Sequence, residues 1–322
     1  MNILSVVPHL GGGLGKVVLA LAERCPGKHT IALLETPQRS FLKPATVDIW
    51  AGKYVKALME DADIVLIHYY DHPAIAKLLS EALPPCRLVF WTHKHYSIPQ
   101  REKEYPDKFF YTSPVQGTDY PYIWSCYDMS RFFEIKPKVH DGFNVGYVGT
   151  VSYKKIHPEW LPMCREIRKA IPEARFTFVG ENLTAVQDAP GITFTGHVDD
   201  VAPYLAEMDI FFYPLRPDHY GTAEQVLGES MAAGVPPVVM NNQAECTILG
   251  DEEIMNGFVA SSEEDCVNCV TYLYNDPVYR GSVSRHTRER ARELYNIDAM
   301  ISQWNIVFQE LMKQPKKERV GI

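Results

Sequence analysis

Short runs of β-branched and aromatic residues alternate with helical patterns along the whole chain, and this alternation limits the fold more than any other feature. In the first half the predicted strands are 2–7, 63–68, 87–91 and 109–112. In the second half they are 145–149, 175–179, 192–195, 210–214, 237–240 and 257–260. Apolar strands separated by helices are typical of parallel sheets that are covered on both faces. We therefore expect an α/β protein.

The chain is long enough for two domains. Its 322 residues allow two units of ordinary size. The segment 132–144 interrupts the pattern, which indicates a domain boundary there. We predict one Rossmann-like domain over 1–140 and a second over 141–298. The remainder, 299–322, should hold a helix that ends at residue 312 and then a frayed, Lys/Arg-rich tail.

Composition narrows the class of protein. The net charge of −8 and the pI near 5.8 argue against nucleic-acid binding as the main role. No apolar run approaches the length of a membrane span, and the first residues form a predicted strand instead of a leader. The seven cysteines are scattered, and the spacing of Cys266 and Cys269 fits one face of a helix better than a zinc site. We expect a cytoplasmic protein.

The segment 220–239 carries the strongest indication of function. A loop-forming opening leads into a predicted helix that ends at Gly234, and a Pro-Pro-Val-Val strand follows. The first N–H groups of a helix lack partners within the helix and lie at its positive dipole end, so they suit a phosphate. Glu229, about two turns further along, is placed to accept hydrogen bonds from a ribose. Together these features predict a nucleotide-diphosphate site.

The same run resembles the nucleotide-sugar signature of family 4 retaining glycosyltransferases, of glycosyl transferases group 1. There a Glu-x7-Glu pair precedes a Met-Ala-x-Gly-x-Pro-Val-Val-like tail. Glu229 matches the second Glu, whereas Gly221 stands where the first belongs. The resemblance is firm over 143–312 and looser over 1–135. It implies the GT-B architecture: two Rossmann-like, doubly wound domains face each other across a cleft, the donor binds mainly to the second, and the C-terminal helix packs back on the first.

A glycine-rich loop, Gly11–Lys16, follows the first predicted strand. Glycines there allow a close approach of the backbone to a ligand. The loop is neither a Walker A sequence nor a dinucleotide fingerprint, because Leu10 and Val17 break the first pattern and Lys16 or Val18 breaks the second. A dehydrogenase is therefore disfavoured. A tight strand–helix turn is the alternative to a ligand-binding role.

The resemblance also implies the donor-binding residues. They are Gly12, Gly13, Thr150, Lys155, Gly221, Thr222, Ala223, Gln225, Val226 and Glu229. The residues that flank the nucleobase are Gly180, Gly196, His197 and Val198. Lys155 matches a lysine that holds the donor diphosphate, but Thr150 replaces the arginine that shares this role. A hydroxyl carries no charge, so this clamp is weaker here than in the family.

Three residues are predicted to be catalytic: His93, Glu224 and Asp218. His93 follows a predicted strand, at the edge where α/β sites form, and a histidine at this place approaches the transferred sugar in the resembled family. His95 is a second candidate. Because Gly221 has no carboxylate for the sugar hydroxyls, we expect Asp218 to turn inward and Glu224 to lie in the first turn of the helix.

The implied reaction moves a sugar from a UDP- or GDP-linked donor to an acceptor hydroxyl with retention, with no cofactor and no metal. The acceptor is a glycan, a lipid-linked sugar or a small molecule, and nucleic acid is not a partner. Two alternatives stay open: a nucleotide-sugar epimerase of GT-B-like fold, and a weakened scaffold that only binds the nucleotide sugar. Peripheral membrane contact also stays open, since the cations over 94–108 give the first domain some positive charge, although acidic residues alternate with them.

Overall fold

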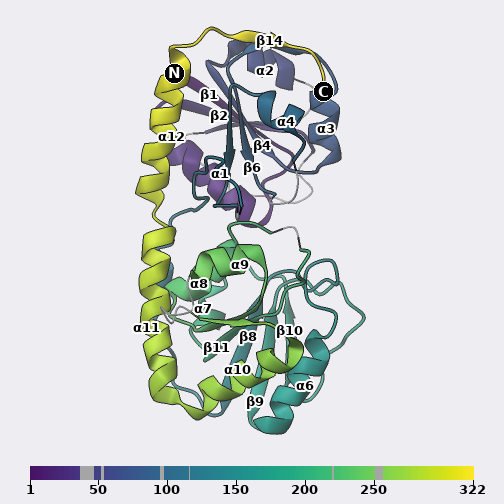
Figure 1. Cartoon of the computed structure of the whole chain (residues 1–322), viewed down its shortest axis with the longest axis vertical. Coiled ribbons are helices and arrows are strands. Elements are labelled where there is room, and N and C mark those ends of the chain that lie inside the picture. The colour runs from purple at the N-terminus through teal and green to yellow at the C-terminus, as the bar shows by residue number, and fades with distance from the viewer. Residues whose placement is uncertain (37–46, 52–53, 95–97, 116, 220, 251–256) are drawn as a thin grey trace. The chain divides into compact units, whose positions relative to one another are not determined.

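The computed structural model describes residues 1–36, 47–51, 54–94, 98–115, 117–219, 221–250 and 257–322. The chain divides into two compact units. The first unit comprises Met1–Asp128, Gly221–Ala223 and Asn296–Ile322, and the second comprises Met129–Tyr220 and Glu224–Tyr295. Each unit holds a six-stranded sheet with helices against it (Figure 1).

The sheet of the first unit is parallel throughout, with the strand order β3-β2-β1-β4-β6-β7. The strands are β1 (Asn2–Val7), β2 (Lys28–Leu33), β3 (Asp48–Ala51), β4 (Ile64–Tyr69), β6 (Leu88–Thr92) and β7 (Lys108–Tyr111). The four strands predicted for this half are confirmed within one residue at each end. β2 and β3 were not predicted, because polar residues interrupt their apolar runs.

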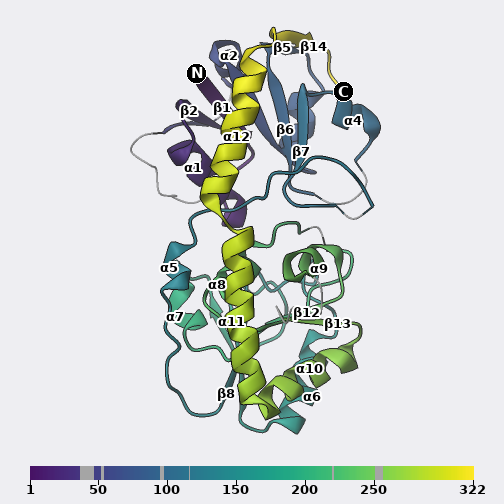
Figure 2. The same ribbon diagram turned by 60° about the vertical axis from the view of Figure 1, so that its left-hand side comes forward.

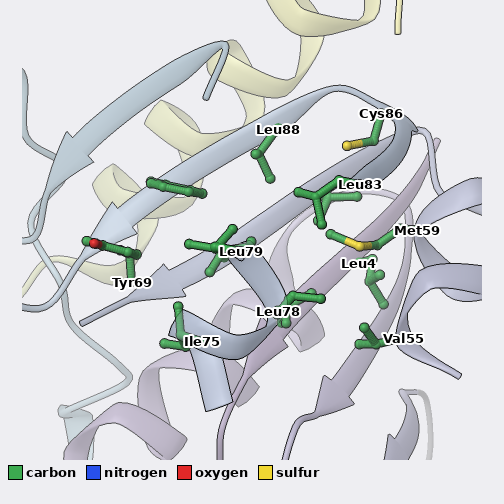
Figure 3. Packing of buried hydrophobic residues seen from close by; sticks show 14 of the residues in the cluster. Leu4, Val55, Met59, Tyr69, Ile75, Leu78, Leu79, Leu83, Cys86 and Leu88 are labelled. Atoms are coloured by element: carbon green, nitrogen blue, oxygen red, sulfur yellow. The ribbon is translucent and has the colours of Figure 1, made fainter. Parts of the chain in front are cut away.

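Helices cover both faces of this sheet. They are α1 (Gly12–Arg24), α2 (Val55–Asp61), α3 (Pro73–Leu79), α4 (Gln100–Glu104) and α12 (Ile297–Met312). Alternate strand residues such as Leu4 and Leu88 form one core with Met59 of α2 and Ile75 of α3 (Figure 3). The opposite face meets α1 and α12, where Trp304 stands edge-on to Trp91 with ring centroids 4.9 Å apart. Figure 2 shows α12 crossing in front of this sheet.

The end of the chain is an ordered strand, which corrects the prediction of a frayed tail. β14 (Lys317–Arg319) pairs antiparallel with β5 (Leu83–Cys86). The guanidinium of Arg319 lies 2.6 Å from Oδ2 of Asp107, and its Nη1 donates to the carbonyl of Cys86 at 2.9 Å. Composition indicated a solvated basic tail, but these specific partners hold the segment in place.

The sheet of the second unit is also parallel, with the order β10-β9-β8-β11-β12-β13. Its strands are β8 (Phe143–Val148), β9 (Ala174–Val179), β10 (Ile192–Gly196), β11 (Ile210–Tyr213), β12 (Pro237–Met240) and β13 (Phe258–Ala260). All six strands predicted for this half are confirmed, with ends that shift by at most two residues. In both sheets the order reverses beside the first strand of the unit, which is the doubly wound arrangement.

The helices of the second unit are α5 (Ser130–Phe133), α6 (Trp160–Ala170), α7 (Ala202–Leu205), α8 (Gln225–Ala232), α9 (Gln243–Leu249), α10 (Glu263–Asn275) and α11 (Pro277–Leu294). α6 and α10 pack together, and Trp160 of α6 stands edge-on to Phe178 of β9. α8 and α11 pack together on the other side of the sheet (Figure 1). Cys266 and Cys269 lie on the buried side of α10 as free thiols, which confirms the interpretation of their spacing.

Within the described ranges, no helix combines the length and the apolar character that a membrane crossing requires.

Candidate functional site

The carboxyl edge of the second sheet brings two loops together. One follows β8 and carries Lys155, and the other follows β11 and leads to α8. The backbone N–H of Arg216 donates to the carbonyl of Lys155 at 2.9 Å, and Ile156 and Leu215 form an antiparallel bridge. This pairing holds Lys155 beside the loop that ends at Glu224.

Glu224 is the centre of the site. It is the N-cap residue of α8, and its side chain is 7% exposed. Its Oε2 accepts hydrogen bonds from Nζ of Lys155 at 2.9 Å and from the hydroxyl of Tyr213 at 2.7 Å. The hydroxyl of Tyr295 donates to its backbone carbonyl at 3.1 Å. The loop after β8 and strand β11 thus hold the carboxylate through Lys155 and Tyr213, and Tyr295 at the end of α11 holds the backbone of the same residue.

A second ion pair lies next to it. Nε2 of His219 lies 3.1 Å from Oε2 of Glu245, and Nδ1 of His219 lies 4.0 Å from Oε1 of Glu224. Glu245 is placed by the start of α9, where its backbone N–H donates to Oδ1 of the N-cap residue Asn242 at 3.2 Å. We call Lys155, Tyr213, His219, Glu224 and Glu245 the buried charge cluster.

The members of the buried charge cluster shift one another's pKa values. Burial raises the pKa of Glu224, but the positive charges of Lys155 and His219 outweigh burial, so this pKa is lowered. Burial lowers the pKa of His219, but attraction to Glu245 and Glu224 outweighs it, so this pKa is raised. Burial, followed by repulsion from Glu224, raises the pKa of Glu245. The His219–Glu245 pair therefore retains its proton to a higher pH than either group would in water.

The cluster has ligand atoms for a cation but also a competing charge. Among the described residues, His219, Glu224 and Glu245 offer ligand atoms that all lie within 4.8 Å of one another. The ammonium group of Lys155 already occupies one side of Glu224, and its positive charge opposes a metal ion there. The donor set therefore fits a cluster balanced by lysine and histidine better than it fits a divalent cation.

Two residues predicted to be catalytic differ in burial: Glu224 is buried, whereas Asp218 is exposed. Glu224 is buried beside Lys155 as the N-cap residue, not inside the first turn of α8. Asp218 does not turn inward, which corrects the prediction. Its two carboxylate oxygens accept hydrogen bonds from Nε and Nη2 of Arg216 at 2.8 and 2.9 Å, and its side chain is 69% exposed. A bidentate pair with an arginine two residues away holds it on the surface.

The expected phosphate-binding helix begins later than predicted. α8 starts at Gln225 and includes Val226, whereas Gly221, Thr222 and Ala223 precede it as loop residues. Glu229 is consequently just over one turn into the helix, where its side chain is buried, instead of about two turns in.

The residues predicted to flank a nucleobase lie in one region, after β9 and β10. The backbone N–H of Gly180 donates to the carbonyl of Gly196 at 3.0 Å. Gly180 has a φ of +139°, and a Cβ atom there would stand 2.2 Å from the carbonyl oxygen of Gly149, so a side chain is excluded. Val198 is partly exposed, and His197 is exposed beside Asp199. Thr150 is also exposed at this edge and reaches Tyr147 through its backbone carbonyl.

In the first unit, the glycine-rich loop opens α1 as predicted. Gly12 is the first residue of α1 and has a φ of +62°, and Gly13 follows it. Gly15 is required by space, because a Cβ atom there would stand 2.2 Å from the carbonyl oxygen of Leu10. His93 follows β6 and contacts His68, as described below; His95 lies outside the described residues.

Three of the cations of segment 94–108 have partners within the first unit. Lys94 is buried and forms an ion pair with Asp71. Nζ of Lys108 lies 3.4 Å from Oε2 of Glu310, and Nζ of Lys103 lies 3.9 Å from the centre of the Tyr120 ring.

Tyr213 and Glu245, which belong to the buried charge cluster, were not among the predicted site residues. Tyr213 is the last residue of β11 and Glu245 lies in the first turn of α9, so both lie at or just after the carboxyl ends of parallel strands. Their position at this edge was the sequence feature that could have identified them.

A hollow of about 560 Å³ lies at the opposite, amino edge of the same sheet, among the first residues of β8 and β9. It contains none of the predicted site residues.

The comparisons with known proteins agree with this geometry. Residues 142–276 match the family model for glycosyl transferases group 1. Among curated proteins, none matches the chain by sequence. The segment that contains the buried charge cluster is therefore similar to glycosyl transferases group 1, in agreement with the resemblance.

Solved structures share the fold over almost the whole chain. Alr3699/HepE of Anabaena, solved in complex with UDP, is 14% identical with a TM-score of 0.72, covering 96% of this chain and 100% of that one. Sucrose-phosphate synthase of Thermosynechococcus elongatus is 13% identical with a TM-score of 0.73, covering 97% and 99%. A glycosyltransferase of Rickettsia africae is 12% identical with a TM-score of 0.71, covering 97% and 99%. The expectation of a GT-B fold is thus confirmed.

Proposed function

We propose that this protein is a retaining glycosyltransferase that moves a sugar from a UDP- or GDP-linked donor to an acceptor hydroxyl. The observation that carries the proposal is the position of Lys155. It lies at the carboxyl edge of the second sheet, inside the segment that matches the transferase family, next to the residue that caps α8. The structures of Alr3699/HepE with UDP and with UDP-glucose favour uracil as the base.

The proposed chemistry needs positive charge where the leaving group forms. The bond between the anomeric carbon and the β-phosphate oxygen breaks, and a bond from the anomeric carbon to the acceptor oxygen forms on the same face. The acceptor proton passes to the leaving diphosphate. Lys155 and the N-terminal end of α8 would stabilise the negative charge that develops on this diphosphate. Since Lys155 supplies the cation, we propose that no metal is needed.

Ligand binding tests the donor site directly. Thermal stability would be measured with UDP, GDP, ADP and their common sugar conjugates, each with and without EDTA. A ligand at about a hundred times its Kd adds roughly 2.7 kcal/mol to the free energy of unfolding. We expect one nucleoside diphosphate to stabilise the protein irrespective of EDTA, and Lys155→Met to weaken that ligand at least tenfold. Failure of every nucleotide to stabilise the protein would refute the proposal.

Turnover separates transfer from simple binding. Gly221 and Thr150, which replace an acidic and a basic residue of the family pattern, favour a scaffold that only binds the nucleotide sugar as a second candidate. A transferase releases free nucleoside diphosphate in step with a glycosylated acceptor, so the best donor would be incubated with an acceptor panel. Binding without release in the presence of every acceptor class would favour the scaffold.

The proposed compartment is the cytoplasm. All seven cysteines are free thiols, six of them buried, and this chemistry suits a reducing environment.

A further inference from the structure

Two histidines of the first unit lie together at the carboxyl ends of neighbouring strands. His68 is the fifth residue of β4, and His93 directly follows β6. The backbone N–H of His93 donates to the carbonyl of Tyr69 at 2.8 Å, which extends the pairing of the two strands by one residue. As a result the rings lie with centroids 5.4 Å apart, and Nδ1 of His68 is 3.2 Å from Nε2 of His93.

Both rings are neutral near pH 7. His68 is fully buried beside the Trp91 ring, and burial, followed by repulsion from His93, lowers its pKa well below the usual value. Burial lowers the pKa of His93 to about 3. A neutral imidazole carries one N–H and one acceptor nitrogen. One proton therefore lies between Nδ1 of His68 and Nε2 of His93. The nitrogen to which this proton is covalently bonded determines the tautomer of both rings.

Burial of the other nitrogen of His68 determines which ring carries this proton. The other nitrogen of His68, Nε2, is buried and has no hydrogen-bond partner among the described residues. If His93 were the donor, this buried Nε2 would carry an orphaned N–H, which costs about 1–3 kcal/mol. If His68 is the donor, its Nε2 is an acceptor, and an acceptor without a partner is tolerated better than a donor. His68 Nδ1–H therefore donates to His93 Nε2.

We propose that His68 is a positioning residue that holds His93 in the Nδ1–H tautomer, so that His93 presents a neutral hydrogen-bond donor to a sugar hydroxyl oxygen of its substrate. The substrate class rests on the proposed function, whereas the tautomer does not. With Nε2 engaged by His68, Nδ1 is the nitrogen left for a ligand, and the ring of His93 is partly exposed. In this state His93 cannot serve as a general base through Nδ1, since that nitrogen already carries its proton.

Nitrogen NMR of histidine-labelled protein tests the tautomer without any substrate. Long-range proton–nitrogen correlations distinguish a protonated ring nitrogen from an unprotonated one, and the spectrum of His93→Gln assigns the signals of His93. We expect protonated Nδ1 and unprotonated Nε2. His68→Leu, which removes the donor, should let His93 populate the other tautomer. His68→Asn, whose amide nitrogen lies near the position of Nδ1, should preserve the native tautomer.

Buried His29 of β2 serves as the internal control, since its signals should be the same in all variants. A protonated Nε2 on His93 in the native protein would overturn the proposal, as would a tautomer that is unchanged in His68→Leu. If His68→Leu does not fold, the spectra of the native protein and of His68→Asn still show which nitrogen of His93 is protonated.

Kinetics connect the tautomer to the reaction. Loss of one oriented neutral hydrogen bond predicts a roughly tenfold lower kcat in His68→Leu, with an unchanged donor KM and recovery in His68→Asn. Equal losses in both variants would contradict positioning by a donated hydrogen bond. Absence of nucleotide binding by a protein with the expected tautomer would defeat the proposed function and leave the tautomer assignment standing.

Discussion

The ammonium group of Lys155 lies 2.9 Å from Oε2 of Glu224, so the cation proposed to meet the donor phosphates has a buried anionic partner before any ligand arrives. A diphosphate that approaches Lys155 must share it with this carboxylate. The carboxylate also repels the phosphates, because like charges interact strongly where water is excluded. We therefore expect the pair to stabilise the fold while weakening the proposed donor complex.

Glu224→Gln should change stability and affinity in opposite directions. The amide can still accept a hydrogen bond from Tyr213, but Lys155 loses its counter-charge, and we expect the free energy of unfolding to fall by about 2 kcal/mol. The UDP Kd should fall about fivefold, since the repulsion is gone. Chemical denaturation and titration calorimetry measure the two effects.

Glu207→Gln is the matched control for this experiment. Glu207 forms an ion pair with Lys138 at 2.8 Å, and both side chains are about half exposed. Its loss should change stability by less than about 1 kcal/mol and leave UDP binding unaltered. Weaker UDP binding in Glu224→Gln would mean that the carboxylate supports the nucleotide, contrary to the argument above.

Thr150→Arg should strengthen donor binding. Thr150 is exposed at the position where the resembled family has an arginine, so the longer side chain meets no packing obstacle in the sheet. A charge-assisted hydrogen bond contributes about 1.5–3 kcal/mol, and we expect at least a tenfold lower UDP Kd with a steeper salt dependence. Thr150→Gln adds similar bulk without charge. If both variants bind UDP equally well, position 150 does not face the phosphates.

The strands, and with them the sheet edge that carries the candidate site, were predictable because they depend on local patterns. β1 and β12 have the predicted bounds, since each is a short apolar run with clear turn residues beside it. Lys155 and Glu229 were proposed as donor-binding residues from motif spacing, and that role stays a prediction. β14 was missed because Lys317–Arg319 is charged throughout, and its order depends on Asp107, over two hundred residues away in sequence.

The internal arrangement of the site could not be predicted, because it depends on competition between partners. Lys155 and Glu224 are 69 residues apart, and no periodicity indicates that they meet. Asp218 and Glu224 were equivalent candidates in the sequence. Arg216 binds Asp218 on the surface, while Tyr213 and Lys155 bind Glu224 in the interior. Contacts in the folded protein thus distinguish two acidic residues that the sequence alone does not.

His219 should make stability fall as the pH rises above neutrality. Its folded-state pKa is raised above the usual 6.5, so its contribution is complete below that value and is lost as the pH rises through the folded pKa. We expect the free energy of unfolding to decrease as the pH rises from 6.5 through the folded-state pKa, by at most about 1.4 kcal/mol per pH unit. In His219→Gln the free energy of unfolding should depend less on pH over this range.

Other groups act outside that window, which keeps the experiment specific. The pKa of His29 is lowered by burial to about 4, so its effect appears only as the pH falls below 6.5. Burial raises the pKa of Cys25 to about 11, and its effect appears only above pH 9. Denaturation curves at half-unit pH steps compare the two proteins. If the free energy of unfolding changes with pH in the same way in the native protein and in His219→Gln, His219 does not hold an extra proton in the folded state.

Arg319→Ala should destabilise the first unit without touching the donor site. The side chain of Asp107 is 1% exposed and that of Arg319 is 7% exposed, so the substitution leaves a buried carboxylate without its buried cationic partner. We expect a loss of about 2–4 kcal/mol at pH 7.

The pH dependence identifies the cause of that loss. Burial raises the pKa of Asp107, but hydrogen bonds from Lys317 and from the backbone N–H of Leu88, together with the charge of Arg319, outweigh burial and lower the pKa below the usual 3.8. The stabilisation is therefore present above pH 3.8 and disappears as the pH falls through the folded pKa, where the variant and the native protein should converge. Lys317→Ala, which removes a half-exposed partner of the same carboxylate, should cost less than about 1 kcal/mol. An equal loss in both variants would place the stabilisation in the backbone pairing of β14 with β5 and not in the buried guanidinium.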